Sequence, residues 1–234
     1  MRKWVYTSVM GHYKKKKKMI KNTIFLGLLL LFSTGISKAD SWENYSAKEY
    51  YSENRKYKLI IIPTFIPEKY YEWMNFKRTK STPNKRNDRK RAKFIKTVTE
   101  KDTTLIPCHG KLFCITGTDT ALVWERKLIN KICPVSAIVS NDGSSITTFN
   151  NWFSNGYGEN VMVVYNENGD LKKTYSLEEI SPYSLNDYFR SISSIWWSSE
   201  QKYIDNESVE IEFYTEKKET TKRIYNTKHL EFEK

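Results

Sequence analysis

The segment Phe149–Gly158 (FNNWFSNGYG) gathers the side chains in this sequence that are best suited to hold a ligand. Asparagine supplies amide donors and acceptors, aromatic rings supply flat apolar platforms, and glycine permits left-handed backbone. This mixture predicts a sugar- or peptide-binding loop. The alternative is a structural loop in which the tryptophan closes the end of a sheet and the amides satisfy turn backbone. The candidate ligand contacts are Asn150, Asn151, Trp152, Asn155 and Tyr157.

A second polar and aromatic segment, residues 190–197, adds Arg190 and Trp196 as candidate contacts. Neighbouring residues on a strand point to opposite faces of a sheet. We therefore expect Trp196 and Trp197 to divide, one entering the core and the other reaching the surface. The alternative is a sheet with one buried tryptophan, beside which the arginine pairs with a carboxylate.

No motif in the sequence marks a catalytic centre. Acidic residues occur in the predicted loops, but no spacing sets a pair apart, and a glycosidase needs two carboxyl groups roughly 5–9.5 Å apart. There is no G-x-S-x-G elbow, no phosphate-binding glycine loop and no H-E-x-x-H motif. With only three histidines and three cysteines, a multi-ligand zinc site is not expected. We predict no catalytic residue, no metal and no cofactor.

The cysteines offer one disulfide. Cys108 and Cys114 flank His109-Gly110-Lys111, which is able to turn a short hairpin and bring the two thiols together. The alternative is that they are small buried thiols. Because three is an odd number, at least one cysteine is unpaired within the chain.

The net charge of +12 is unevenly distributed. Residues 1–39 contain nine basic and no acidic residues, which leaves +3 on residues 40–234. Residues 77–96 contain ten basic residues and one aspartate, so the remainder carries −6. Residues 77–91 have no apolar period and predict a mobile basic loop. The loop lacks interleaved aromatic residues, so nucleic acid is not the expected partner. The expected partner is an anionic surface, with a solvated loop as the alternative, and the contacts are Lys77, Arg78, Lys85, Arg86, Arg89, Lys90 and Arg91.

The elements that position these residues are mostly short strands. Strands are predicted at 56–64, 94–99, 112–116, 121–125, 136–140, 145–149, 161–165, 171–175, 192–197, 208–214 and 220–225. Asn141-Asp142-Gly143 and residues 166–170 supply the chemistry of tight hairpin turns. One helix is predicted at 181–189, and 68–76 is either a short helix or extended. This pattern predicts an all-β antiparallel meander of blade-like sheets with one short helix, in an open propeller-like or sandwich-like arrangement.

An internal repeat supports blade-like sheets. Residues 51–59 and 139–147 both read as serine, then Asn/Asp at a turn, then an alternating strand. The stretch 128–197, through Val139-Ser140-Asn141-Asp142-Gly143 and Gly156-Tyr157-Gly158, resembles a family of exported bacterial proteins of unknown function with β-propeller-like sequence features. Arg55 departs from that pattern, where glycine is more usual. The resemblance implies an exported β-protein and no particular activity.

The N-terminus predicts export. The apolar run Ile24–Phe32 follows a lysine cluster and precedes Ser37-Lys38-Ala39, the order of a secretory signal peptide cleaved before Asp40. The alternative is an uncleaved anchor at residues 20–36 in the inner membrane. Because Met19 begins a compact signal on its own, residues 1–18 are also explained by a misassigned start codon. Residues 40–234 are then a single β-rich domain.

The functional expectation follows from these features. We expect an exported, periplasmic or extracellular, non-catalytic binding or scaffold module of the cell envelope, whose partner is an envelope glycan or protein. The alternatives are a carboxylate-dependent hydrolase acting on envelope glycans and a membrane-anchored protein.

Overall fold

The computed structural model describes residues 42–78 and 85–233. The predicted signal peptide, its cleavage site and the alternative anchor lie outside the described residues. Asp40–Lys234 forms a compact unit of its own. Among the helices that the structure describes, none has the length and apolar character needed to cross a membrane.

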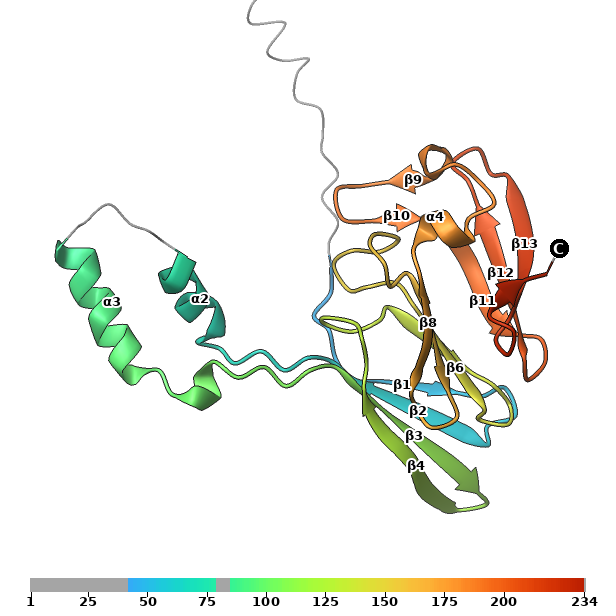
Figure 1. Ribbon diagram of the computed structural model, residues 1–234, viewed down its shortest axis with the longest axis horizontal. Coiled ribbons are helices and arrows are strands. Elements are labelled where there is room, and N and C mark those ends of the chain that lie inside the picture. Colours follow the sequence, from blue (N-terminus) through green and yellow to red (C-terminus); the bar gives the residue numbers. More distant parts are fainter. Residues whose placement is uncertain (1–41, 79–84, 234) are drawn as a thin grey trace, which may run out of the picture. The chain divides into compact units, whose positions relative to one another are not determined.

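Three four-stranded antiparallel sheets follow one another along the chain (Figure 1). The first sheet contains β1 (Lys48–Tyr51), β2 (Tyr57–Ile62), β3 (His109–Thr116) and β4 (Asp119–Lys127). The second contains β5 (Ser136–Val139), β6 (Ser145–Phe149), β7 (Met162–Asn166) and β8 (Leu171–Tyr175). The third contains β11 (Ser198–Tyr203), β12 (Ser208–Tyr214), β13 (Thr220–Asn226) and β14 (Glu231–Phe232). A two-stranded hairpin, β9 (Phe189–Arg190) with β10 (Ile195–Trp196), precedes the third sheet. Each sheet pairs its strands in sequence order, which confirms the predicted all-β meander.

The two middle strands of the second sheet, β6 and β7, are buried on both faces. Val163 and Tyr165 of β7 pack in a core shared with the first sheet, where Leu59 and Leu112 lie. The alternate residues of β7 pack in a second core with the third sheet. Because both faces are covered, β7 is apolar at successive positions rather than at every other one.

The outer faces of the first and third sheets are charged. In β12, Glu210 alternates with the buried residues Val209 and Ile211 and therefore points away from the core. Its carboxylate pairs with Lys222 at 2.8 Å. In the first sheet, Lys111 pairs with Glu125 across β3 and β4 at 3.1 Å. The outer sheets thus carry ion pairs at the surface, although Leu122 and Val123 of β4 are also exposed.

The predicted repeat forms two equivalent turns. Between β1 and β2, Ser52 Oγ accepts from Tyr57 N at 3.0 Å, and between β5 and β6, Ser140 Oγ accepts from Ser145 N at 3.0 Å. The left-handed position of each turn is held by Arg55 (φ 58°) and Gly143 (φ 72°). The two turns bind each other, because Asn54 N donates to Asn141 Oδ1 at 2.8 Å and Asn54 Nδ2 donates to Asn141 O at 2.8 Å.

An insertion between β2 and β3 contains two helices, α2 (Tyr70–Arg78) and α3 (Lys85–Thr97). Its two ends pair through an antiparallel bridge between Phe65 and Ile106. The prediction of an irregular loop at 77–91 is therefore wrong for its described part, and so is the predicted strand at 94–99. Lysine and arginine are good helix formers, and repulsion between like charges one turn apart costs only a few tenths of a kcal/mol. The predicted mobility stays a prediction, and residues 79–84 lie outside the described residues.

The helix predicted at 181–189 is also placed differently. The structure has α4 at Leu177–Ile180, followed by a 3₁₀ turn at Leu185–Asp187. The helix begins earlier because Glu179 Oε2 accepts from Ser176 N at 2.6 Å, as part of a capping box. Pro182 follows the helix instead of opening it. With α2 and α3, the described chain has more helix than the single short one predicted.

Two glycines allow the energetic cost of a left-handed backbone to be measured separately from the cost of steric overlap. Gly143 (φ 72°) faces Tyr57 so closely that an added Cβ would overlap the ring, whereas Gly117 (φ 62°), at the β3–β4 turn, has no atom within 4 Å of that position. We expect Gly143→Ala to lower the free energy of unfolding by about 2–4 kcal/mol and Gly117→Ala by about 1–2 kcal/mol. Urea denaturation measures both values, and equal losses would show that the Tyr57 ring moves aside at no cost.

Candidate functional site

The loop between β6 and β7 is fastened by a buried amide. Asn150 adopts a left-handed conformation, with φ at 61°. Its side-chain oxygen accepts from Gly156 N at 2.9 Å and from Trp197 Nε1 at 2.8 Å. One oxygen thereby closes the loop on itself and ties it to the core of the third sheet.

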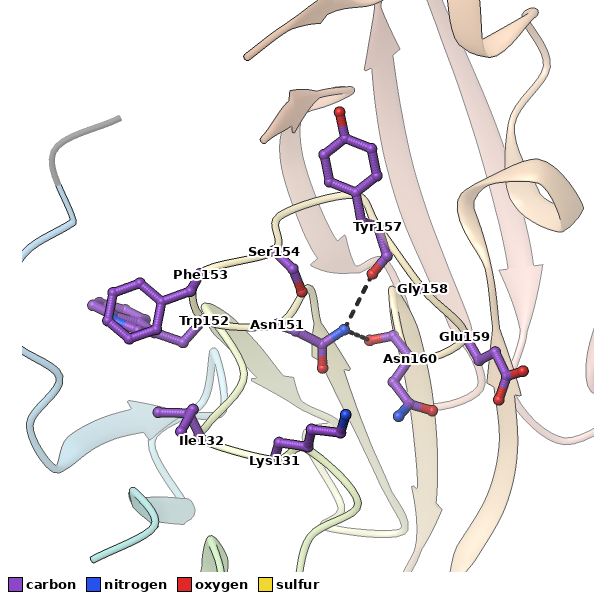
Figure 2. A pocket seen from close by; sticks show the side chains of 10 residues that line it. All are labelled: Lys131, Ile132, Asn151, Trp152, Phe153, Ser154, Tyr157, Gly158, Glu159 and Asn160. Carbon is purple, nitrogen blue, oxygen red and sulfur yellow. Dashed lines mark hydrogen bonds between the residues drawn. The ribbon is translucent and has the colours of Figure 1, made fainter. Parts of the chain in front are cut away.

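Asn151 fastens the opposite side of the loop. Its Nδ2 donates to Asn160 O at 3.2 Å, and Figure 2 shows this bond beside a longer one to Tyr157 O. Its Oδ1 accepts from Asn130 Nδ2 at 2.7 Å, which connects the loop to the β4–β5 connection. Among the described residues, the buried Oδ1 of Asn130 has no hydrogen-bond partner.

Three aromatic rings form an aromatic shelf, defined here as Trp42, Trp152 and Phe153. The ring centroids of Trp42 and Trp152 are 5.4 Å apart, and those of Trp42 and Phe153 are 5.6 Å apart. Lys48 Nζ lies 4.9 Å from the Trp152 ring. Phe153 has φ at 66° and remains 47% exposed. A bulky residue seldom adopts this conformation, so the loop holds a strained backbone where it presents a ring to solvent.

A cavity of about 500 Å³ lies beside the shelf. Trp152 and Phe153 belong to its wall, together with side chains of both charges, Lys131 and Glu159. Figure 2 shows these residues on the β4–β5 connection and the β6–β7 loop, with the Trp152 and Phe153 rings together on one side and Glu159 on the other. The complete lining is Lys131, Ile132, Asn151, Trp152, Phe153, Ser154, Tyr157, Gly158, Glu159 and Asn160.

The contact residues predicted in the β6–β7 loop fall into two groups, those that line the cavity and those that hold the loop in place. Asn151, Trp152 and Tyr157 line the cavity. Asn150 has the structural role described above. Asn155 is also structural, since its Nδ2 donates to Ile195 O at 3.2 Å. The loop therefore has both predicted roles. Asn150 and Asn155 satisfy backbone and core groups, as in a structural loop, while Asn151, Trp152 and Tyr157 line a cavity, as in a binding loop.

The remaining two predicted contacts lie elsewhere. Arg190 and Trp196 belong to the β9–β10 hairpin and do not line the cavity. Arg190 donates to Asn186 Oδ1 at 2.9 Å, and Trp196 packs against Phe189 with ring centroids 5.2 Å apart. Trp197 is 1% exposed while Trp196 is half-buried, so the predicted division of the two tryptophans is confirmed.

Sequence reasoning missed Trp42 of the shelf and seven residues of the lining, which are Lys131, Ile132, Phe153, Ser154, Gly158, Glu159 and Asn160. Phe153, Ser154 and Gly158 carried a signal, because they lie within the predicted loop 149–158. The others have no local signal. Trp42 reaches the shelf from the start of the described chain, and its Nε1 donates to Ser193 Oγ at 3.0 Å.

A second cavity, of about 310 Å³, lies where the first strands of the three sheets meet. It is lined from β1, β5 and β11 and from the turns that follow β1 and β5. Glu53 and Lys202 are its charged residues. Across this region Tyr203 and Thr147 join the third sheet to the second, with 3.1 Å between their hydroxyl oxygens.

The predicted Cys108–Cys114 disulfide is wrong. Cys114 lies within β3 and Cys108 immediately precedes the same strand, so the six-residue separation spans roughly 20 Å of extended chain, far beyond disulfide reach. All three thiols are free, and Cys108 and Cys133 are buried. Among the described residues there is no cluster of three or more His, Cys, Asp or Glu suited to a metal ion.

Removing the buried amide tests how the loop is held. We expect Asn150→Ala to lower the free energy of unfolding by about 2–4 kcal/mol, because Gly156 N and Trp197 Nε1 lose their acceptor. Trp197→Phe removes one of the two donors, and the double variant should lose less than the sum of the single losses. Urea denaturation of the four proteins measures this coupling; strict additivity would contradict it.

Thiol reactivity tests the burial of the cysteines. Burial raises the pKa of Cys108 to about 12 and that of Cys133 to about 11. The thiolate is the reactive form, so at pH 8 iodoacetamide should label the partly exposed Cys114 and spare the other two until the protein unfolds. In the unfolded chain these thiols ionise near pH 9, whereas in the folded protein they stay protonated to higher pH. Ionisation therefore favours the unfolded chain, and the protein loses stability as the pH rises from about 9 towards 12. Mass spectrometry of the labelled peptides gives the order, and rapid labelling of Cys108 in the folded protein would contradict it.

Comparison with family models, curated proteins and solved structures finds no match. What the cavity is able to bind is therefore argued from the side chains that line it.

Proposed function

We propose that this protein is a non-catalytic binding module whose ligand is an uncharged glycan, seated in the cavity beside the aromatic shelf. The observation that carries the proposal is the exposed Phe153 ring, held in a strained backbone conformation at the edge of that cavity. Aromatic rings offer flat apolar faces, and a sugar ring has apolar C–H groups that pack against such a face.

The polar lining supports the same ligand class. Asn160, Ser154 and the charged pair Lys131 and Glu159 supply donors and acceptors around the apolar wall. Binding pockets commonly combine an apolar surface with a few polar groups that fix orientation. Because the lining contains one lysine and one glutamate, its formal charges balance, which favours a neutral, hydroxyl-rich ligand.

The carboxylate count favours binding over hydrolysis. Glycoside hydrolysis by the usual route requires two carboxyl groups. Among the described residues, Glu159 is the only carboxylate that lines the first cavity and Glu53 the only one that lines the second. The hydrolase alternative therefore has less support than the binding module. The cell-envelope location remains part of the proposal and rests on the pattern of residues 1–39.

Binding to neutral oligosaccharides released from a bacterial cell wall tests the proposal. We expect Phe153→Ala to weaken binding by about 2- to 12-fold, which corresponds to the loss of one aromatic contact. Phe153→Tyr keeps the ring and should bind as the unsubstituted protein does. Titration followed by tryptophan fluorescence is suitable, because Trp42 and Trp152 belong to the shelf.

A matched control is available in the β9–β10 hairpin. Phe189 is an exposed ring that packs on a tryptophan, like Phe153, but it lies outside the cavity. Phe189→Ala should leave the affinity unchanged. The proposal fails if no neutral oligosaccharide binds, or if the Phe153 and Phe189 variants lose affinity equally.

A further inference from the structure

Helix α3 carries an exposed basic face, defined here as Arg89, Lys90, Lys93 and Lys96. Residues three and four positions apart are neighbours on a helix surface. The spacings 89–93, 90–93 and 93–96 therefore bring the four side chains to one side of the helix. The only acidic residue of α3 is Asp88.

These cations are not neutralised by the described part of the chain. Among the described residues, none of the four forms an ion pair, whereas Lys111, Lys202 and Lys222 of the sheets all pair with glutamates. Arg89 and Lys93 lie one turn apart, where like charges are destabilising by a few tenths of a kcal/mol. Lysines on the sheets are paired with glutamates, whereas the charged residues of α3 are nearly all basic.

The charge is also segregated along the chain. Residues 77–96 carry +9, while the rest of residues 40–234 carries −6. An anionic surface therefore attracts this segment and repels the remainder, which gives the contact an orientation.

We propose that α3 docks on the surface of an anionic phospholipid bilayer through its basic face. Lysine and arginine near such a surface are each attracted by the headgroup charge within about one Debye length. The helix then lies along the surface, with its charged side chains at the headgroups. Single-stranded nucleic acid fits less well, because Phe94 is the only aromatic residue of α3, whereas binders of single strands stack successive bases on several aromatic side chains. The inference is independent of the proposed glycan site.

Vesicle co-sedimentation tests the docking. The protein used is residues 40–234, because the three sheets, both cores and α3 all lie within that compact unit. The probes are phosphatidylcholine vesicles with and without phosphatidylglycerol. We expect binding only to the anionic vesicles, with a loss of affinity as salt shortens the Debye length. The variant Arg89→Gln, Lys90→Gln, Lys93→Gln, Lys96→Gln should bind about tenfold more weakly or worse.

Two further variants separate a basic face from net charge and from misfolding. Lys56, Lys127, Lys217 and Lys218 are exposed residues of the sheets and turns, and changing all four to Gln removes the same charge. This control should retain its affinity to within about twofold. Asp88→Asn removes the one opposing charge of α3 and should tighten binding by about two- to fivefold, a gain that misfolding does not produce.

Several results would overturn the proposal. The helix variant and the sheet control losing affinity equally would show that only net charge matters. Equal binding of neutral and anionic vesicles would remove the electrostatic contact. Tighter binding to an oligonucleotide than to the anionic vesicles at the same salt concentration would assign the basic face to nucleic acid instead.

Discussion

The burial of the two middle strands of the second sheet on both faces is the constraint on which the rest of the structure depends. Its strands supply apolar side chains to two separate cores, one shared with the first sheet and one with the third. Neither outer sheet has a buried face without the second. β6 is buried along its whole length. The hydroxyl of Thr147 pairs there with Tyr203 of the third sheet, whereas the buried hydroxyl of Thr148 has no hydrogen-bond partner among the described residues.

The ion pairs on the outer sheets help to explain why the protein is stable with three sheets and needs no further sheet to cover them. In repeat proteins the terminal units must present a polar outer surface to remain soluble. Here the alternation within β12 turns apolar residues inward and Glu210 outward, and Lys222 pairs with that carboxylate. Exposed pairs of this kind contribute little to stability. Their importance lies in giving water a surface to solvate where another sheet would otherwise be required.

Local pattern was sufficient to predict most of the sheets. The bounds predicted for 145–149, 171–175 and 208–214 are those of β6, β8 and β12. Period-two alternation and Asn/Asp/Gly turns act over a few residues, so they are visible in the sequence. Helix α3 was missed because the prediction weighed charge repulsion and the lack of an apolar period above the helix propensity of lysine and arginine. The site was predicted in part, because Trp42 meets Trp152 through the packing of distant segments, which no local spacing encodes.

The insertion between β2 and β3 has a consequence for how the chain folds. Ile62 of β2 pairs with His109 of β3, so forming the first sheet requires closure of a long loop that contains α2 and α3. Non-local pairing of this kind slows folding, yet doubling the loop would cost only about 0.6 kcal/mol in closure entropy. The length and composition of the insertion are therefore only weakly constrained by the stability of the sheet it interrupts, and substitutions there are free to follow the demands of a binding surface.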